Sequence, residues 1–162
     1  MNVAIVSDTH VPSRAQRIPE EFRELIDEAD HVIHAGDFDA ESTIADVREL
    51  ASELTAVRGN TDPQVGLPAV ASVELGGVEF VATHGAGSAR GYEDRVANAA
   101  RQHGSDGAIA VSGHTHEMTD RTHRGVRILN PGSATGASPA TRATMMTADV
   151  ADGAIDVTVH EL

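Results

Sequence analysis

The sequence predicts a single α/β domain that spans residues 1–162 and is built on two β-sheets. In the first third of the chain, short apolar runs alternate with helical stripes, which is typical of βαβ units. In the second half, short apolar runs are separated by Gly-containing turns, which is typical of hairpins. No linker, internal repeat or low-complexity tract divides the chain. We therefore expect a mostly parallel first sheet and a mostly antiparallel second sheet.

The first sheet is predicted to begin at residues 3–6, a continuous apolar run of the kind that is buried on both faces. A helix should open at Pro19, because Pro suits the first turn and Glu20 and Glu21 suit its positive end. Its apolar side chains recur at helical spacing: Phe22, Leu25, Ile26 and Ala29. Residues 31–34 are predicted as the second strand, and residues around 56–58 as the third. The intervening helix is marked by another stripe: Ile44, Val47, Ala51 and Leu54.

The second half predicts three hairpins, one helix and one further buried strand. The hairpins pair residues 70–75 with 78–83, 119–123 with 126–129, and 144–150 with 155–160. The helix covers residues 92–103, and the buried strand covers residues 108–111. The Gly/Ser/Thr/Ala-rich stretch 132–141 is predicted to be a long loop inside the domain.

The composition restricts the partners of this chain. It has 25 acidic and 12 basic residues, a formal net charge of −13 and no Cys, and every basic residue is Arg. A protein this negative would approach duplex nucleic acid or an anionic membrane against its own field. No basic leader or long apolar run is present, so we expect a cytoplasmic protein. The acidic surplus without Lys also suggests adaptation to high salt, where the Debye length falls to about 3 Å at 1 M.

Five predicted strands end in Asp, Asn or His, usually beside Gly. Ligands bind outside the carboxyl ends of strands in parallel α/β sheets, so these residues should meet at one edge. Each short motif alone is weak, and a turn, a cap or a satisfied core histidine is its commoner role. Their order along one short chain is the informative feature. Seven side chains are of ligand type: Asp8, His10, Asp37, Asn60, His84, His114 and His116.

These seven side chains are enough for two metal ions if one carboxylate bridges them. A pair of divalent ions about 3.5–4 Å apart would then receive four protein bonds each. The donors are all oxygen or nitrogen, with no thiolate, which favours Mn²⁺, Fe, Zn²⁺, Ni²⁺ or Co²⁺ over a soft-metal site. Among these we expect Mn²⁺, and Mg²⁺ is also left open. Two dications would also let a strongly negative protein bind a phosphate anion.

The same residues carry a family resemblance. Asp8-x-His10, Gly36-Asp37, Gly59-Asn60, His84 and Gly113-His114-x-His116, in this order, resemble the calcineurin-like metallophosphoesterase superfamily. The short chain and the stretch 130–133 resemble its small single-domain phosphodiesterase branch in bacteria and archaea. The resemblance implies a four-layer αββα sandwich, with two mixed β-sheets flanked by helices.

The resemblance also implies roles for individual residues. Asp8, His10 and His116 would hold one metal ion; Asn60, His84 and His114 would hold the other; Asp37 would bridge both. Phosphorus would be attacked in line by a hydroxide between the two ions. Asp37, Asn60 and Asp62 are thus the predicted catalytic residues, and Thr61 and Ser133 the predicted substrate-binding residues.

Thr61 departs from the family pattern, which often places a His directly after the Asn. That His is often assigned to protonating the leaving group, and Thr is a poor acid at neutral pH. Substrates with good leaving groups should suffer least from the change. Asp62 matches the acid that follows in the family, and its plainer role is to orient the loop. His34 is predicted to be structural.

Alternative functions remain at this point. A small phosphate ester is the expected substrate, and a phosphodiesterase is favoured over a phosphomonoesterase. A non-catalytic interaction module, like the retromer subunit that resembles these enzymes, is a second class, and a homo-oligomer is left open. The segment 85–91 loosely resembles a dinucleotide-binding loop, but its spacing is G-x-G-x-x-x-G and it follows a hairpin strand, so we reject that interpretation.

Overall fold

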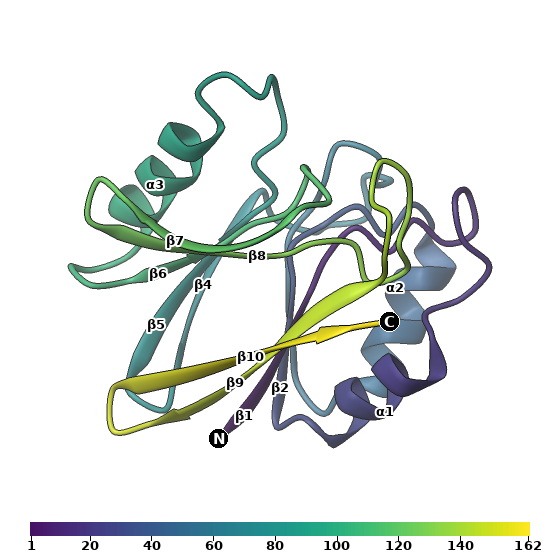
Figure 1. Cartoon of the computed structure of the whole chain (residues 1–162), viewed down its shortest axis with the longest axis horizontal. Coiled ribbons are helices and arrows are strands. Elements are labelled where there is room, and N and C mark those ends of the chain that lie inside the picture. The colour runs from purple at the N-terminus through teal and green to yellow at the C-terminus, as the bar shows by residue number, and fades with distance from the viewer.

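Two five-stranded β-sheets pack face to face in the computed structural model, which describes residues 1–162 (Figure 1). The first sheet contains, in spatial order, β10 (Ala154–Glu161), β9 (Thr144–Ala151), β1 (Asn2–Val6), β2 (His31–His34) and β3 (Leu54–Ala56). The second contains β4 (Val70–Leu75), β5 (Val78–Thr83), β6 (Ile109–Val111), β8 (Val126–Pro131) and β7 (Met118–His123).

Both sheets are mixed, as the family resemblance implied. The β1–β2 and β2–β3 pairs are parallel, whereas β1–β9 and β9–β10 are antiparallel. In the second sheet, β6 runs parallel to both β5 and β8, and the outer pairs are antiparallel. The expectation of a mostly parallel first sheet and a mostly antiparallel second sheet is therefore wrong. Its cause is the C-terminal hairpin, which returns to the first sheet beside β1.

Three helices complete the four layers. Helices α1 (Glu20–Glu28) and α2 (Glu41–Leu50) cover the outer face of the first sheet, and α3 (Tyr92–His103) covers the outer face of the second (Figure 1). The predicted stripe of the second helix ran too far, because α2 ends at Leu50 and Leu54 begins β3. Leu54 pairs with Val32 of β2, so sheet pairing decides the conformation there. The third strand accordingly lies two residues earlier than expected.

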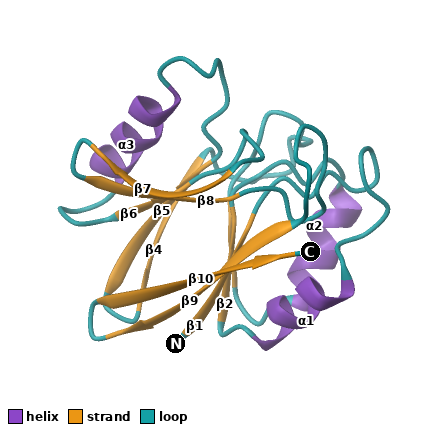
Figure 2. Cartoon of the chain, viewed as in Figure 1, coloured by secondary structure: helices purple, strands orange, loops and turns teal.

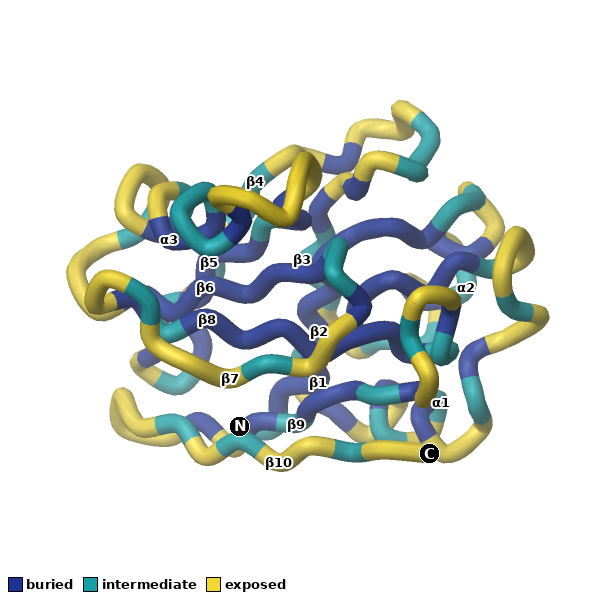
Figure 3. The backbone as a smooth tube through the Cα atoms, turned by 45° about the horizontal axis from the view of Figure 1, so that its top comes forward, coloured by how far each residue is buried: buried dark blue, intermediate teal, exposed yellow.

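The core between the sheets is continuous and apolar. Strand β1 alternates across it: Val3 and Ile5 face the second sheet, whereas Ala4 and Val6 face α1 and α2. All four side chains are buried, as the unbroken apolar run predicted. The central strands form a dark, buried layer in Figure 3, and the edge strands β7 and β10 are largely exposed.

The loops that follow the carboxyl ends of β1, β2 and β3 gather at one end of the sandwich, together with those that follow β5 and β6 (Figure 2). This arrangement brings residues far apart in sequence to the same edge, as expected for parallel neighbours. None of the three helices is both long enough and apolar enough to cross a membrane.

Candidate metal centre

The carboxylate of Asp8, directly after β1, lies fully buried among imidazoles. Its Oδ2 accepts hydrogen bonds from the Ser7 hydroxyl (2.6 Å) and from the backbone N–H of His114 (3.1 Å). Its Oδ1 lies 3.2 Å from His116 Nε2 and 3.7 Å from His10 Nε2. One oxygen is thus held by the protein, and the other is turned toward the cluster of ring nitrogens.

Asp37, after β2, lies between two groups of side chains. Its Oδ1 accepts the backbone N–H of Thr61 (3.0 Å). Its Oδ2 is 3.2 Å from His84 Nε2 and 3.5 Å from His10 Nε2. Both imidazoles therefore approach the same oxygen from different strand ends.

All seven predicted ligands meet at this edge of the fold. Two sets of potential ligand atoms each lie within 4.8 Å of one another, and Asp37 belongs to both. The first set is Asp8, His10, Asp37 and His116, and the second is Asp37, His84 and His114. Asn60 joins the second set, because its Oδ1 is 3.1 Å from His114 Nδ1. The two groups contain the residues that the family resemblance implied for each ion, and their roles as metal ligands stay predictions.

The outer nitrogen of each imidazole has a partner that can only accept a hydrogen bond. Three rings use Nδ1 in this way: His10 toward Asp39 Oδ1 (2.7 Å), His84 toward the Ala35 carbonyl (2.7 Å) and His116 toward the Ala137 carbonyl (2.8 Å). His114 is reversed, with Nε2 toward the Gly87 carbonyl at 2.9 Å. Because carbonyl and carboxylate oxygens accept, the ring proton lies on the outer nitrogen. When such a ring is neutral, its other nitrogen presents a lone pair to the cluster.

With neutral rings, the interior of the cluster therefore consists of acceptors facing acceptors. His10 Nε2 and His116 Nε2 are 3.2 Å apart. Asp8 Oδ1 and His84 Nε2 are buried and have no hydrogen-bond partner, although His84 Nε2 has Asp37 Oδ2 nearby. Buried polar atoms without a partner are rare and call for a physical reason. Divalent cations satisfy such nitrogen and oxygen lone pairs, so the donor set fits metal binding.

The charges shift the pKa values of the same groups. Burial by itself would raise the pKa of Asp8, but the nearby imidazoles of His10 and His116 hold that pKa well below its usual range. The pKa of Asp37 is also lowered, because His84 outweighs the opposing effect of burial. Burial would lower the pKa of His10 and His84, but the neighbouring carboxylates raise both. Protons and cations thus compete for the same lone pairs.

The backbone is strained where the predicted ligands lie. A positive φ is uncommon outside Gly and costs of order 1–3 kcal/mol per residue. Eight non-glycine residues adopt it in this chain, and six belong to this centre: Asp8, His10, Asp37, Asp39, His114 and His116. Such clustering is typical of sites where function over-determines the backbone.

Glycines allow close approach at the strand ends. A Cβ on Gly59 would lie 2.0 Å from Asp37 Oδ1, and one on Gly113 would lie 2.5 Å from Asp8 Oδ2. No side chain could occupy either position without displacing a carboxylate. The Gly residues beside the ligands are therefore part of the site.

Sequence reasoning missed Asp39. Its carboxylate accepts from His10 Nδ1 and from the Thr61 hydroxyl (2.6 Å), and it also pairs with the Ser13 hydroxyl. A carboxylate behind a metal-binding imidazole fixes the ring orientation. The only sequence signal was its place two residues after Asp37, on the same loop.

Three other predicted site residues are engaged with the loops. The Asp62 carboxylate accepts the backbone N–H groups of Asp37 (2.9 Å), Asp39 (2.9 Å) and Gly59 (2.8 Å). These contacts are those of a residue that orients the loop. The Thr61 hydroxyl donates to Asp39. Ser133 is fully buried; its hydroxyl donates to the Asp8 carbonyl (2.8 Å). The catalytic role of Asp62 and the substrate-binding roles of Thr61 and Ser133 stay predictions.

His34 is structural in its contacts. It is fully buried and stacks on Phe38, with ring centroids 3.5 Å apart. Its Nδ1 accepts the Gly36 N–H (3.1 Å), and burial lowers its pKa to about 3. A neutral His34 therefore supports the turn that leads to Asp37.

Comparison with known proteins agrees with this geometry. Residues 1–153 match the calcineurin-like phosphoesterase superfamily domain. The chain belongs to the calcineurin-like phosphoesterase superfamily. It is 31% identical over 137 residues to a probable metallophosphoesterase of Methanothermobacter thermautotrophicus, a match that covers 83% of this chain and 78% of the relative. For this superfamily member, hydrolase chemistry with divalent metal ions is the family expectation.

Solved structures of the superfamily fold are similar over the whole chain. A single mutant of Vps29 from Entamoeba histolytica has a TM-score of 0.80 and 28% identity, covering 100% of this chain and 99% of that one. Wild-type Vps29 from the same organism, complexed with zinc, has a TM-score of 0.78 and 28% identity, covering 99% of each chain. Vps29 of Chaetomium thermophilum, at 21% identity and a TM-score of 0.82, covers 99% of this chain and 96% of its own and shares the fold.

Proposed function

We propose that this chain is a phosphodiesterase that depends on two divalent metal ions. The observation that carries the proposal is the acceptor-only interior of the cluster. His10 Nε2 faces His116 Nε2 at 3.2 Å, and Asp8 Oδ1 is buried without a hydrogen-bond partner. Membership of a phosphoesterase superfamily supports the same conclusion.

The proposed ligands divide into two sets that share one carboxylate. Asp8, His10 and His116 would hold one ion, Asn60, His84 and His114 the other, and Asp37 would contact both. When bound, the ions would lower the pKa of a water molecule and neutralise charge on the phosphoryl oxygens. Mn²⁺ is the proposed native ion; a donor set of oxygen and nitrogen atoms accommodates it, as it does Fe, Zn²⁺, Ni²⁺ and Co²⁺.

The remaining residues of the site would position these ligands. Asp62 holds the backbone of Asp37 and Gly59, so its proposed catalytic contribution is to fix the shared carboxylate. Asp39 orients His10. Ser133 fixes the carbonyl of Asp8 and would bound the substrate side of the loop. These contacts keep the ligands pre-arranged, which reduces the reorganisation needed during reaction.

Thr61 shapes the proposed substrate preference. Its hydroxyl donates to Asp39, and neither group is placed as a ready acid for a departing alkoxide. Hydrolysis without a strong acid favours leaving groups of low pKa. A small phosphodiester with such a leaving group is therefore the proposed substrate, with Thr61 on the wall of its site.

We also propose that the protein is cytoplasmic and binds neither duplex nucleic acid nor membranes. Its net charge of −13 would oppose its approach to either polyanionic surface.

The test is a paired assay. Release of nitrophenol from bis-nitrophenyl phosphate and from nitrophenyl phosphate should be followed with Mn²⁺, other divalent ions and a chelator. The proposal expects metal-dependent turnover that is faster on the diester. Faster turnover of the monoester would replace it with a phosphomonoesterase.

A second candidate function is supported by the structural neighbours. Several are Vps29 proteins, and one of them, from Chaetomium thermophilum, is described in complex with a cyclic peptide. The second candidate is that this chain uses the same fold as a non-catalytic interaction module. The complete ligand set favours the enzyme. Metal binding without turnover of either ester, across several metals, would favour the module.

A further inference from the structure

The loop formed by residues 85–91 contacts the metal centre, although the sequence analysis assigned it no function. It connects β5 to α3, and residues 86–91 are exposed. The carbonyl of Gly87, within this 85–91 loop, accepts the hydrogen bond of His114 Nε2 at 2.9 Å. His114 thus depends on an exposed, glycine-rich segment, whereas the other three imidazoles have partners in other loops.

Arg95 of α3 holds this loop in place. Its guanidinium donates to three carbonyls of the 85–91 loop: Ser88 (2.7 Å), Gly85 (3.1 Å) and Arg90 (3.1 Å). The guanidinium carbon also lies 6.0 Å from the centre of the Tyr92 ring. Three hydrogen bonds from one rigid planar group restrict the loop in a way that a flexible ammonium reproduces only in part.

The packing between Arg95 and Gly87 is close. A Cβ on Gly87 would lie 3.1 Å from the guanidinium carbon, and Gly87 has φ of +126°. The guanidinium therefore lies directly against the residue whose carbonyl accepts from His114. Displacing Arg95 would free that carbonyl to move.

The backbone before His114 is held by hydrogen bonds in which Arg95 takes no part. Tyr92 OH donates to the Gly113 carbonyl at 2.7 Å, and Asn130 Nδ2 donates to the same carbonyl at 3.1 Å. The backbone before His114 is thus fixed, and the ring orientation depends on Gly87. Arg95 can therefore change the ring without changing the path of the chain.

We infer that Arg95 is a positioning residue for His114. By fixing the Gly87 carbonyl, it keeps the ring proton on Nε2 and turns Nδ1 toward Asn60 Oδ1, 3.1 Å away. Only the set containing Asn60, His84 and His114 depends on it. This inference rests on the proposed two-metal function. It deepens that function, because the affinity for one ion can then be changed without changing the affinity for the other.

The test compares Mn²⁺ binding to wild-type protein and Arg95→Met by titration calorimetry, with metal content measured after desalting. Loss of an outer partner typically costs about 10–100-fold in metal affinity. We expect Arg95→Met to lose that much affinity for one Mn²⁺ ion and to bind the other with unchanged affinity. Arg95→Lys should restore part of the loss.

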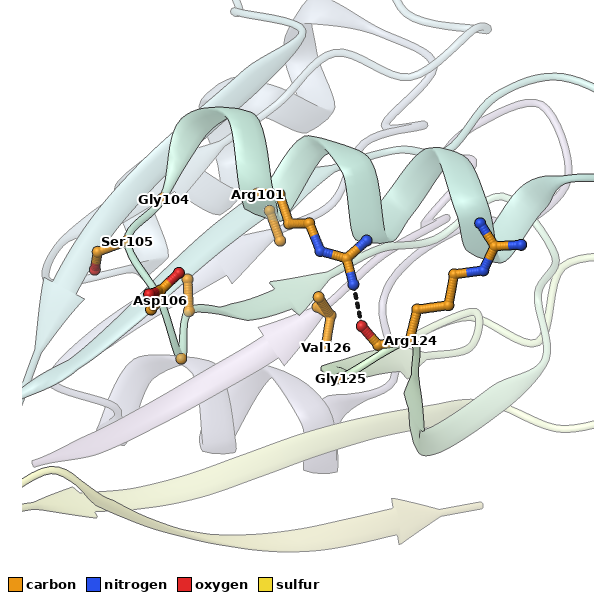
Figure 4. A pocket seen from close by; sticks show the side chains of 10 residues that line it. Arg101, Gly104, Ser105, Asp106, Arg124, Gly125 and Val126 are labelled. Atoms are coloured by element: carbon orange, nitrogen blue, oxygen red, sulfur yellow. Dashed lines mark hydrogen bonds between the residues drawn. The ribbon is translucent and has the colours of Figure 1, made fainter.

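A second variant changes the loop and leaves the sequence of α3 unaltered. Gly87→Ala places a methyl group against the Arg95 guanidinium and should weaken the binding of the same ion. Arg101→Met is the matched control, because Arg101 lies on the same helix and donates to the Arg124 carbonyl beside a pocket of about 260 Å³ (Figure 4). That pocket is lined by none of the ligands.

A readout without metal separates this role from simple stability. Nitrogen NMR of the metal-free protein should show the Nε2-protonated form of His114 in wild type and a mixture in Arg95→Met. Failure of wild type to bind two ions would overturn the proposed function. Two ions bound equally well by wild type, Arg95→Met and Gly87→Ala, with unchanged His114 signals, would overturn the role of Arg95 alone.

Discussion

Replacing Asp37 with Asn should weaken the binding of both metal ions together. The Oδ2 atom of Asp37 lies 3.2 Å from His84 Nε2 and 3.5 Å from His10 Nε2, so it is within reach of both ligand sets. The substitution removes one negative charge and keeps an oxygen atom and the side-chain volume. It therefore tests the shared charge more than the packing.

The size of the effect follows from Coulomb's law. Two unit charges about 4 Å apart interact by about 4 kcal/mol at an effective dielectric constant of about 20. A dication doubles this attraction, but the retained amide oxygen and the relief of repulsion with Asp8 oppose the loss. We expect a loss of about 3–4 kcal/mol per ion, which corresponds to an affinity about 10²–10³-fold weaker.

The assay is calorimetric titration of Mn²⁺ into metal-free Asp37→Asn, with diesterase activity measured in parallel. Asp120→Asn is the control, because Asp120 pairs with Arg127 on the β7–β8 hairpin and the substitution changes net charge equally. If Asp37→Asn weakened the binding of only one ion, the proposal that both ions share this carboxylate would be refuted. An equal loss in Asp120→Asn would assign the effect to net charge.

Three further results are expected. The neighbouring carboxylates raise the pKa of His10 and His84 against the effect of burial, so protons compete with metal ions up to and above the ordinary pKa of 6.5. The affinity for Mn²⁺ should therefore fall when it is measured from about pH 8 down to about pH 6. An affinity that does not change over this range would contradict the competition. Gly59→Ala should reduce the metal content, because its methyl group would lie 2.0 Å from Asp37 Oδ1. Gly107→Ala is the control, because its methyl group meets nothing within 4 Å. Since Gly107 has φ of +86°, this control should only lower the free energy of unfolding, by about 1–2 kcal/mol. With a net charge of −13, the protein should lose thermal stability as KCl is lowered from about 2 M to about 0.1 M; a melting temperature that stays constant or rises in scanning calorimetry would end the high-salt interpretation.

The sequence by itself determined the local elements and which side chains were candidates for metal ligands. Strand β1 was recognisable because four consecutive apolar residues suit a strand buried on both faces. Helix α3 begins and ends where its stripe predicted, at Tyr92 and His103. Asp8 and Asp37 were recognisable because parallel strands deliver their carboxyl ends to one edge. These features depend on neighbours in the chain, so periodicity and order are enough to find them.

Only the tertiary structure decided which distant segments meet. The C-terminal hairpin pairs beside β1, and no local pattern specifies that choice among the open sheet edges. His10 and His116 face each other across 106 positions. Asp39 contacts the His10 ring, and Arg95 contacts the carbonyls of the 85–91 loop, so their proposed roles arise from the orientation of those partners. Such contacts depend on the packing of whole layers, which is why the candidate ligands could be named in advance and the residues that contact them could not.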